Sequence, residues 1–282
     1  MRVFLSSFLG NTLSNLGYIV AGFYGVLQCL KVREVLPIRY AWLYVWMAVI
    51  GIGSFMFHAT LLYSMQLLDE IPMLFSNSQM LYLLYRIKTL LVLFNGLFFC
   101  RWHPETELKM VNWIPKWIRS TPLLYYTFSI IITVLYVYNP ACTLFFQVSY
   151  GAMILLMAVS LHFYARQIPS GASVKVLLDR AAIFILFAFA IWNVDNLMCE
   201  KLRKLRSEYL PSFLGPLLQF HAWWHVLTMI SGTHSLVAVT MAWFKMNPKK
   251  MEKAGISWKL DAHFNGILPW IHFKKSQKSK NQ

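Results

Sequence analysis

QFHAWWHVLTMISGTHSLVAVTMAWF, residues 219–244, is a long apolar segment with two histidines at its start, four residues apart. A hydrocarbon core of about 30 Å is crossed by roughly 20 helical residues, so the segment predicts a membrane-spanning helix. His221 and His225 would lie on one face of that helix, at a spacing that can present two imidazoles to one zinc ion. Ionisable side chains inside a membrane helix usually mark a functional site. The pair therefore indicates a site at the head of this segment.

The composition of the whole chain also indicates a membrane protein. Of the 282 residues, 58% are hydrophobic and only 13% are charged, about half the charged share of a soluble domain. The mean hydropathy is +0.51. We therefore predict an all-α membrane protein. The net charge of +15 does not indicate a nucleic-acid partner, because the basic residues lie between the apolar segments and in the tail, where they orient a chain in a membrane.

Seven apolar ranges are long enough, or nearly so, to be transmembrane helices. They are 8–30, 41–62, 70–87, 122–139, 143–165, 177–198 and 216–244. The run 90–100 is too short to span, so we predict an interfacial helix there and a surface loop over 101–119. With seven spans, 21 lysines and arginines fall on one side and 5 on the other. This bias predicts a lumenal N-terminus and a cytosolic C-terminus.

Two more motifs bring polar side chains to the predicted depth of the histidine pair. Ser54 and His58 stand four residues apart near the lumenal end of the second range and so share one helical face. Gly51 and Gly53, just before them, permit close helix approach in lipid. Asp69 stands at the start of the third range, where the helix dipole favours an acid. Three separate segments thus contribute to one side of the membrane.

This set of side chains predicts metal-assisted hydrolysis. His58, His221 and His225 would be the three ligands of a catalytic zinc, which keeps its fourth position for water. Asp69 would take a proton from that water and pass it to a leaving amine, and Ser54 would hydrogen-bond the developing oxyanion or the water. From the residues alone, the alternatives stay open: histidines that only bond neighbouring helices, an acid that only caps a helix, or a Ser/His/Asp triad.

Four motifs in matching order and spacing resemble those of the alkaline ceramidase family, part of a superfamily of seven-span hydrolases that includes the adiponectin receptors. The motifs are Gly51–His58, Gln66–Met73, Trp192–Asn196 followed by Cys199 and Glu200, and Gln219–His225. The resemblance implies zinc held by the three histidines, with Ser54 and Asp69 as catalytic partners. It also implies hydrolysis of ceramide, taken from the bilayer, to sphingosine and a fatty acid in the endoplasmic reticulum or Golgi membrane.

The chain departs from the family pattern at its start. The resemblance implies an acidic N-terminal segment and a glutamate that bind calcium, but the glutamate position here is Phe8 and no acidic residue precedes Glu34. We therefore expect zinc and no calcium site of the family type. Two other functions stay open: a catalytically weakened relative, or a seven-span lipid sensor or receptor with a structural zinc. The resemblance also implies an N-terminal disulfide partner for Cys199, which this sequence lacks, and Cys142 on the same predicted lumenal side could take its place.

These inferences divide the chain into two parts. We predict a seven-transmembrane-helix hydrolase domain over residues 1–244 and a basic cytosolic tail over 245–282. The lysines of the tail favour a solvated anchor that is drawn to anionic lipid of the cytosolic leaflet. The expected partners are ceramide and the membrane.

Overall fold

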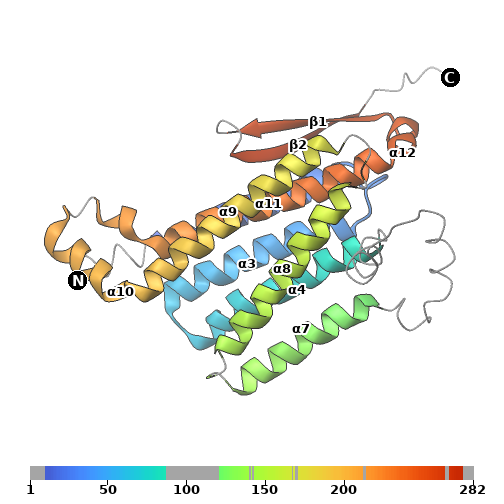
Figure 1. Ribbon diagram of the computed structural model, residues 1–282. Coiled ribbons are helices and arrows are strands. Elements are labelled where there is room, and N and C mark those ends of the chain that lie inside the picture. The colour runs from blue at the N-terminus through green and yellow to red at the C-terminus, as the bar shows by residue number, and fades with distance from the viewer. Residues whose placement is uncertain are drawn as a thin grey trace, which may run out of the picture. The chain divides into compact units, whose positions relative to one another are not determined.

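A computed structural model shows two compact units, Met1–Pro72 with Pro169–Gln282 and Met73–Ile168 (Figure 1). The structure describes residues 10–86, 121–139, 141, 143–166, 168, 171–211, 214–263 and 267–275. The expected interfacial helix over 90–100, the loop over 101–119, Phe8 and Cys142 lie outside these residues.

Seven long helices occur in the described part of the chain, and each overlaps one of the seven predicted ranges. They are α2 (Leu16–Lys31), α3 (Arg39–Thr60), α4 (Tyr63–Arg86), α7 (Thr121–Tyr138), α8 (Thr143–Arg166), α9 (Ala172–Leu197) and α11 (Phe220–Met246). Four helices are long and apolar enough to cross a membrane: Gly10–Lys31, Arg39–Thr60, Thr143–Arg166 and Phe220–Met246. The chain is thus mostly helical with four candidate spans, while the count of seven and the orientation stay predictions.

In the first unit, α11 packs along α9 and α2 packs along α3 (Figure 1). Most of α11 is buried, as suits a helix that is apolar on all sides. By contrast, α2 exposes Val20, Phe23 and Leu27. These residues follow the helical spacing of three and four, so they form one apolar stripe. An exposed stripe of this kind is suited to contact with lipid acyl chains.

The approach of α2 to α3 depends on Gly51, as the sequence predicts. A Cβ atom at Gly51 would lie 2.6 Å from the Cβ of Tyr18 and 2.9 Å from the amide nitrogen of Ile19. Because such contacts are too short for a real Cβ, only glycine permits the two helix backbones to come this close. The close helix approach that we predict at this position is confirmed.

The second unit contains the C-terminal part of α4 together with α7 and α8. Polar side chains join α4 to α7 there, because the Ser78 and Ser129 hydroxyls lie 2.8 Å apart and Ser78 also donates to the Tyr125 carbonyl at 2.9 Å. The Tyr136 and Phe146 rings stack between α7 and α8, with their centroids 4.8 Å apart.

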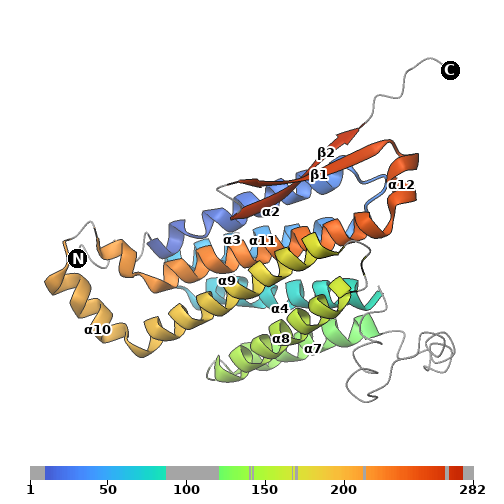
Figure 2. The same cartoon turned by 45° about the horizontal axis from the view of Figure 1, so that its top comes forward.

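Much of the tail is folded, while its cytosolic side and its attraction to anionic lipid stay predictions. It contains α12 (Pro248–Lys253) and an antiparallel hairpin of β1 (Ile256–His263) and β2 (Leu268–Lys275). The hairpin lies along the first unit, where β2 contacts α11 and α2 (Figure 2). The helical chain therefore also contains a two-stranded sheet, which the all-α prediction does not include.

The first strand of the hairpin, β1, alternates apolar and polar residues, whereas β2 begins with four apolar residues, Leu268–Ile271. Trp258 pairs with Phe273 across the two strands, and both rings contact Phe244 of α11, with centroids 6.1 and 5.1 Å away. A period of two is the strand signature, and it puts these side chains on one face. At the end of β2, the Lys275 ammonium donates to Glu34 at 2.9 Å and holds the pKa of that carboxyl below its usual value. This pair is exposed, so it contributes little stability.

Candidate metal and catalytic site

The site begins with the last turns of α3 and the reversal that follows it. Ser54 and His58 lie one turn apart on α3, which ends at Thr60. Leu61 then adopts a left-handed conformation with φ of 55°, and its N–H donates to the Phe57 carbonyl. Glycine is the usual residue at such a helix end. The tight reversal leads the chain into α4 and lets the first turns of α4 return alongside α3.

Gly53 determines how closely α4 returns to α3. A Cβ atom at Gly53 would lie 2.6 Å from the carbonyl carbon of Leu68 and 2.9 Å from the amide nitrogen of Asp69. The backbones of the two helices therefore touch at this point. As a result, the hydroxyl of the buried Ser54 hydrogen-bonds to the carboxyl of Asp69.

The start of α11 supplies the other two histidines. The helix begins at Phe220, so His221 stands in its first turn and His225 in its second. The segment before it is held by two side chains: Trp223 Nε1 donates to the Leu217 carbonyl at 3.1 Å, and Arg206 donates to the Leu218 carbonyl at 2.9 Å. These bonds set the point at which the chain enters the helix.

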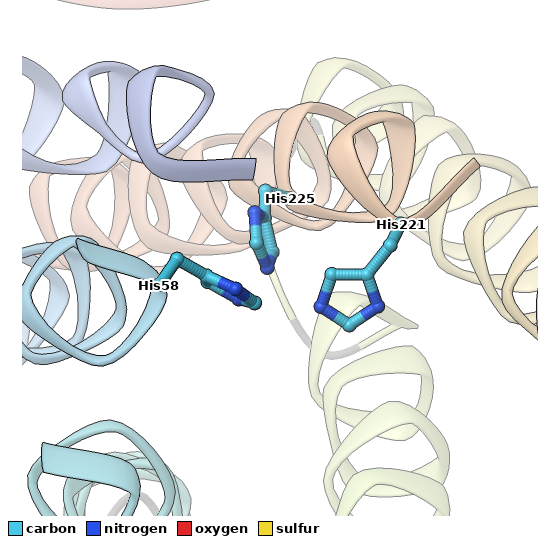
Figure 3. A group of neighbouring side chains, drawn as sticks. All are labelled: His58, His221 and His225. Carbon is cyan, nitrogen blue, oxygen red and sulfur yellow. The ribbon is translucent and has the colours of Figure 1, made fainter. Parts of the chain in front are cut away.

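The three histidines form a compact triangle (Figure 3). The ring centroids of His58 and His221 are 5.0 Å apart, those of His58 and His225 4.8 Å, and those of His221 and His225 4.7 Å. One nitrogen from each ring lies within 4.8 Å of the others, so the group could hold a metal ion. His58 and His225 are buried, and His221 is half-buried.

The surroundings of His225 fit a metal ligand. Its Nδ1 atom contacts Ser14 and Asn15, and the ring also hydrogen-bonds to the Asn11 backbone, all near the start of the described chain. The other ring nitrogen points toward His58 and His221 (Figure 3). With Nδ1 engaged by the protein, Nε2 is the atom available to a metal.

All five predicted site residues lie in the first unit. The three histidines meet in one cluster, and Ser54 meets Asp69, while the shared helix α3 joins the cluster to the pair. Two other histidines bond within their own helices. His162 contacts Arg166 on α8, and His234 donates from Nδ1 to the Ile230 carbonyl within α11.

The motif Trp192–Asn196 at the end of α9 packs against the site rather than joining it. The Trp192 and Trp224 rings lie 5.8 Å apart, so this motif braces the first turns of α11. Cys199 is an exposed free thiol in the described part of the chain. Ser14 and Asn15 are not among the site residues that the sequence predicts. Their signal is their polarity within the otherwise apolar first range.

The sequence of this chain matches one family model and several known proteins. The model of the family described as Ceramidase matches residues 7–272 of this chain. The chain is 33% identical to "Alkaline ceramidase 3" of Mus musculus over 221 residues, which cover 77% of this chain and 71% of that protein. It is 27% identical to "Alkaline ceramidase YPC1" of Saccharomyces cerevisiae over 230 residues, which cover 77% of this chain and 66% of that protein. It is 26% identical to "Putative alkaline ceramidase dcd3A" of Dictyostelium discoideum over 242 residues, 78% of this chain and 75% of that protein.

Proposed function

Because this chain belongs to the ceramidase family, we propose that it hydrolyses the amide bond of ceramide to a sphingoid base and a fatty acid. The observation that carries the proposal is the meeting of three histidines beside the Ser54–Asp69 pair, at the ends of apolar helices. Ceramide is itself a membrane lipid, so it would reach this site from the bilayer. We propose the endoplasmic reticulum or Golgi as the membrane.

His58, His221 and His225 would hold a zinc ion. Three neutral imidazole nitrogens are the ligand set of several catalytic zinc sites, and three protein ligands leave one position open. A zinc ion bound there would lower the pKa of a water molecule toward about 7 and polarise a carbonyl group. A purely structural zinc normally has four protein ligands, so the histidine triangle with an acid nearby fits a catalytic site better.

Asp69 would move the proton that the reaction requires, and its hydrogen bond with Ser54 supports this role. As the oxygen of water bonds to the amide carbon, the Asp69 carboxylate takes the proton that this oxygen loses. As the carbon–nitrogen bond breaks, the same carboxyl returns a proton to the departing nitrogen. One water molecule is consumed, and the products are a carboxylic acid and an amine, so the atoms balance.

Ser54 would serve both the acid and the substrate. Its hydroxyl first donates to the Asp69 carboxylate. When Asp69 becomes protonated, the carboxyl can donate to the Ser54 oxygen instead, because a hydroxyl both donates and accepts. The Ser54 proton is then released to bond the substrate oxygen just as that oxygen gains negative charge.

The proposal is tested with purified protein in lipid nanodiscs that contain ceramide. We expect equal amounts of sphingosine and fatty acid by mass spectrometry, loss of both after treatment with a zinc chelator, and recovery when zinc is restored. Zinc bound at one ion per chain without any release of sphingosine would contradict the proposal and favour a lipid sensor with a structural metal.

Replacing Gly53 with alanine is expected to lower ceramide hydrolysis by about tenfold or more. The added methyl group would press on the Leu68–Asp69 backbone and move the Asp69 carboxyl away from Ser54, and a misplacement of about 1 Å can cost a hundredfold in rate. The histidines remain, so zinc content should not change.

Gly151→Ala is the matched control for this substitution. Gly151 is also helical, but nothing lies within 4 Å of a Cβ added there, so activity should stay at the wild-type level. Equal activity in Gly53→Ala and the wild type would contradict the role assigned to the contact between α3 and α4.

A further inference from the structure

The helix that leads into α2 is broken at Ser14 and Asn15. The amide of Ser14 donates to the Gly10 carbonyl at 3.0 Å, as in an α-helix, but the amide of Asn15 donates to the Thr12 carbonyl at 3.3 Å, only three residues back. The regular ladder resumes with Ile19, whose amide donates to the Asn15 carbonyl. The shortened step turns the Asn15 amide away from the Asn11 carbonyl, which an unbroken α-helix would pair with it.

Side chains from the break converge on the Asn11 carbonyl. The Ser14 hydroxyl donates to it at 2.9 Å and the Asn15 Nδ2 group at 2.8 Å. The imidazole of His225, more than 200 residues later, reaches the same place. Its Nδ1 atom lies 2.9 Å from the Ser14 hydroxyl, and the ring also hydrogen-bonds to the Asn11 backbone. Asn15 is almost wholly buried, so this cluster is enclosed.

The bonding pattern determines which nitrogen of His225 carries the proton in a metal-binding state. Ser14 gives its own proton to the Asn11 carbonyl, so the lone pairs of its oxygen are free to accept one. The Asn11 carbonyl is an acceptor only. Both groups therefore favour a protonated Nδ1, which leaves the Nε2 lone pair for a metal. The Asn15 Nδ2 group is a donor and lies farther from Nδ1, at 3.2 Å, and it already donates to the Asn11 carbonyl at 2.8 Å, so the two acceptors outweigh it. The opposite tautomer would place the proton on Nε2 and block coordination there.

We propose that Ser14 is a positioning residue for zinc, which holds His225 in the tautomer and orientation that a metal ligand needs. The inference rests on the proposed zinc site, and Ser14 acts through His225. The proposed role also explains the break in the helix. In an unbroken helix, the Asn11 carbonyl would accept the backbone hydrogen bond of Asn15 instead. Among the described residues, the N-terminal segment thereby joins α3, α4 and α11 in building the site.

The test measures zinc affinity by competition with a chromophoric chelator. Ser14→Ala removes the acceptor, and we expect zinc to bind about tenfold to a hundredfold more weakly, as for other partners of metal-binding histidines. Ser14→Thr retains the hydroxyl and should restore affinity to within a few fold of the wild type. Ser231→Ala is the matched control: Ser231 lies on the same helix as His225 and donates to the Ala181 carbonyl at 2.7 Å, so its loss should leave zinc affinity unchanged.

Thermal unfolding separates positioning from a structural role. Zinc that binds only the folded state raises the melting temperature, and the rise grows with the logarithm of the zinc affinity. We expect this zinc-induced rise to shrink in Ser14→Ala while the zinc-free protein melts near the wild-type temperature. A lower melting temperature of the zinc-free protein with an unchanged zinc-induced rise would mean a structural role and would overturn the inference.

The outcomes also separate this inference from the proposed function. Wild-type affinity in Ser14→Ala, or no rescue by Ser14→Thr, overturns the role of Ser14 alone. A wild-type protein that binds no zinc overturns both proposals. If zinc binds and Ser14→Ala weakens it, but ceramide is not cleaved, the positioning role stands while the proposed activity fails.

Discussion

His221→Ala is expected to abolish both zinc binding and ceramide hydrolysis. The substitution removes one of three ligand nitrogens that lie within 4.8 Å of one another, and the two remaining imidazoles cannot form the usual three-ligand catalytic site. A metal contributes several kcal/mol of transition-state stabilisation, so we expect hydrolysis to fall by roughly a thousandfold or more. Elemental analysis of the purified protein gives the zinc content, and mass spectrometry of released sphingosine gives the rate.

His162→Ala is the control for this prediction. His162 lies on α8 in the second unit and contacts Arg166, so its loss should change neither zinc content nor rate. If His221→Ala keeps one zinc per chain and the wild-type rate, the histidine triangle is not the catalytic metal site. The substitution His58→Ala tests the histidine of the triangle that comes from α3 rather than α11.

Asp69→Asn is expected to lower ceramide hydrolysis by about a hundredfold to ten-thousandfold while zinc stays bound. The amide has nearly the shape of the carboxylate but cannot accept and return a proton, and general acid–base groups contribute roughly this range of rate. The three histidines are unchanged, so zinc content should equal that of the wild type. Rate and metal content are measured on the same preparation.

Glu70→Gln provides the matched control, since it makes the same chemical change one residue later. Glu70 accepts a hydrogen bond from Gln66, whereas Asp69 bonds to Ser54. We expect the glutamine variant to retain most of its activity. Equal losses in the two variants would show that the effect is general to acids of this segment, and loss of zinc in Asp69→Asn would show a role in metal binding.

Local patterns in the sequence predict much of the structure. The apolar range 216–244 corresponds to α11 over Phe220–Met246, and 143–165 corresponds to α8 over Thr143–Arg166. Long apolar runs specify such helices because a backbone in lipid must satisfy its own hydrogen bonds. The spacing of His221 and His225 likewise predicts a shared face, which the closeness of their rings bears out.

Other features escape prediction because they depend on weak or distant signals. The alternation typical of a strand covers few residues of the tail, and lysines interrupt it. The sequence of the β1–β2 hairpin therefore predicts a solvated basic tail rather than a sheet. Leu61 closes α3 in a left-handed conformation that glycine normally supplies. The role of the helix break at Ser14 and Asn15 depends on a contact with His225, which lies far along the chain, so local sequence does not reveal it.

The sequence by itself determined the contacts within each helix. The 3.6-residue period places Ser54 beside His58, and His221 beside His225, wherever those helices lie. Only the tertiary structure decided that these pairs meet. Close packing at Gly53 brings Asp69 to Ser54, and the packing of the first unit brings His58 to His221 and His225. The helical period is a property of the backbone, whereas the meeting of distant segments depends on how side chains of different helices fit together.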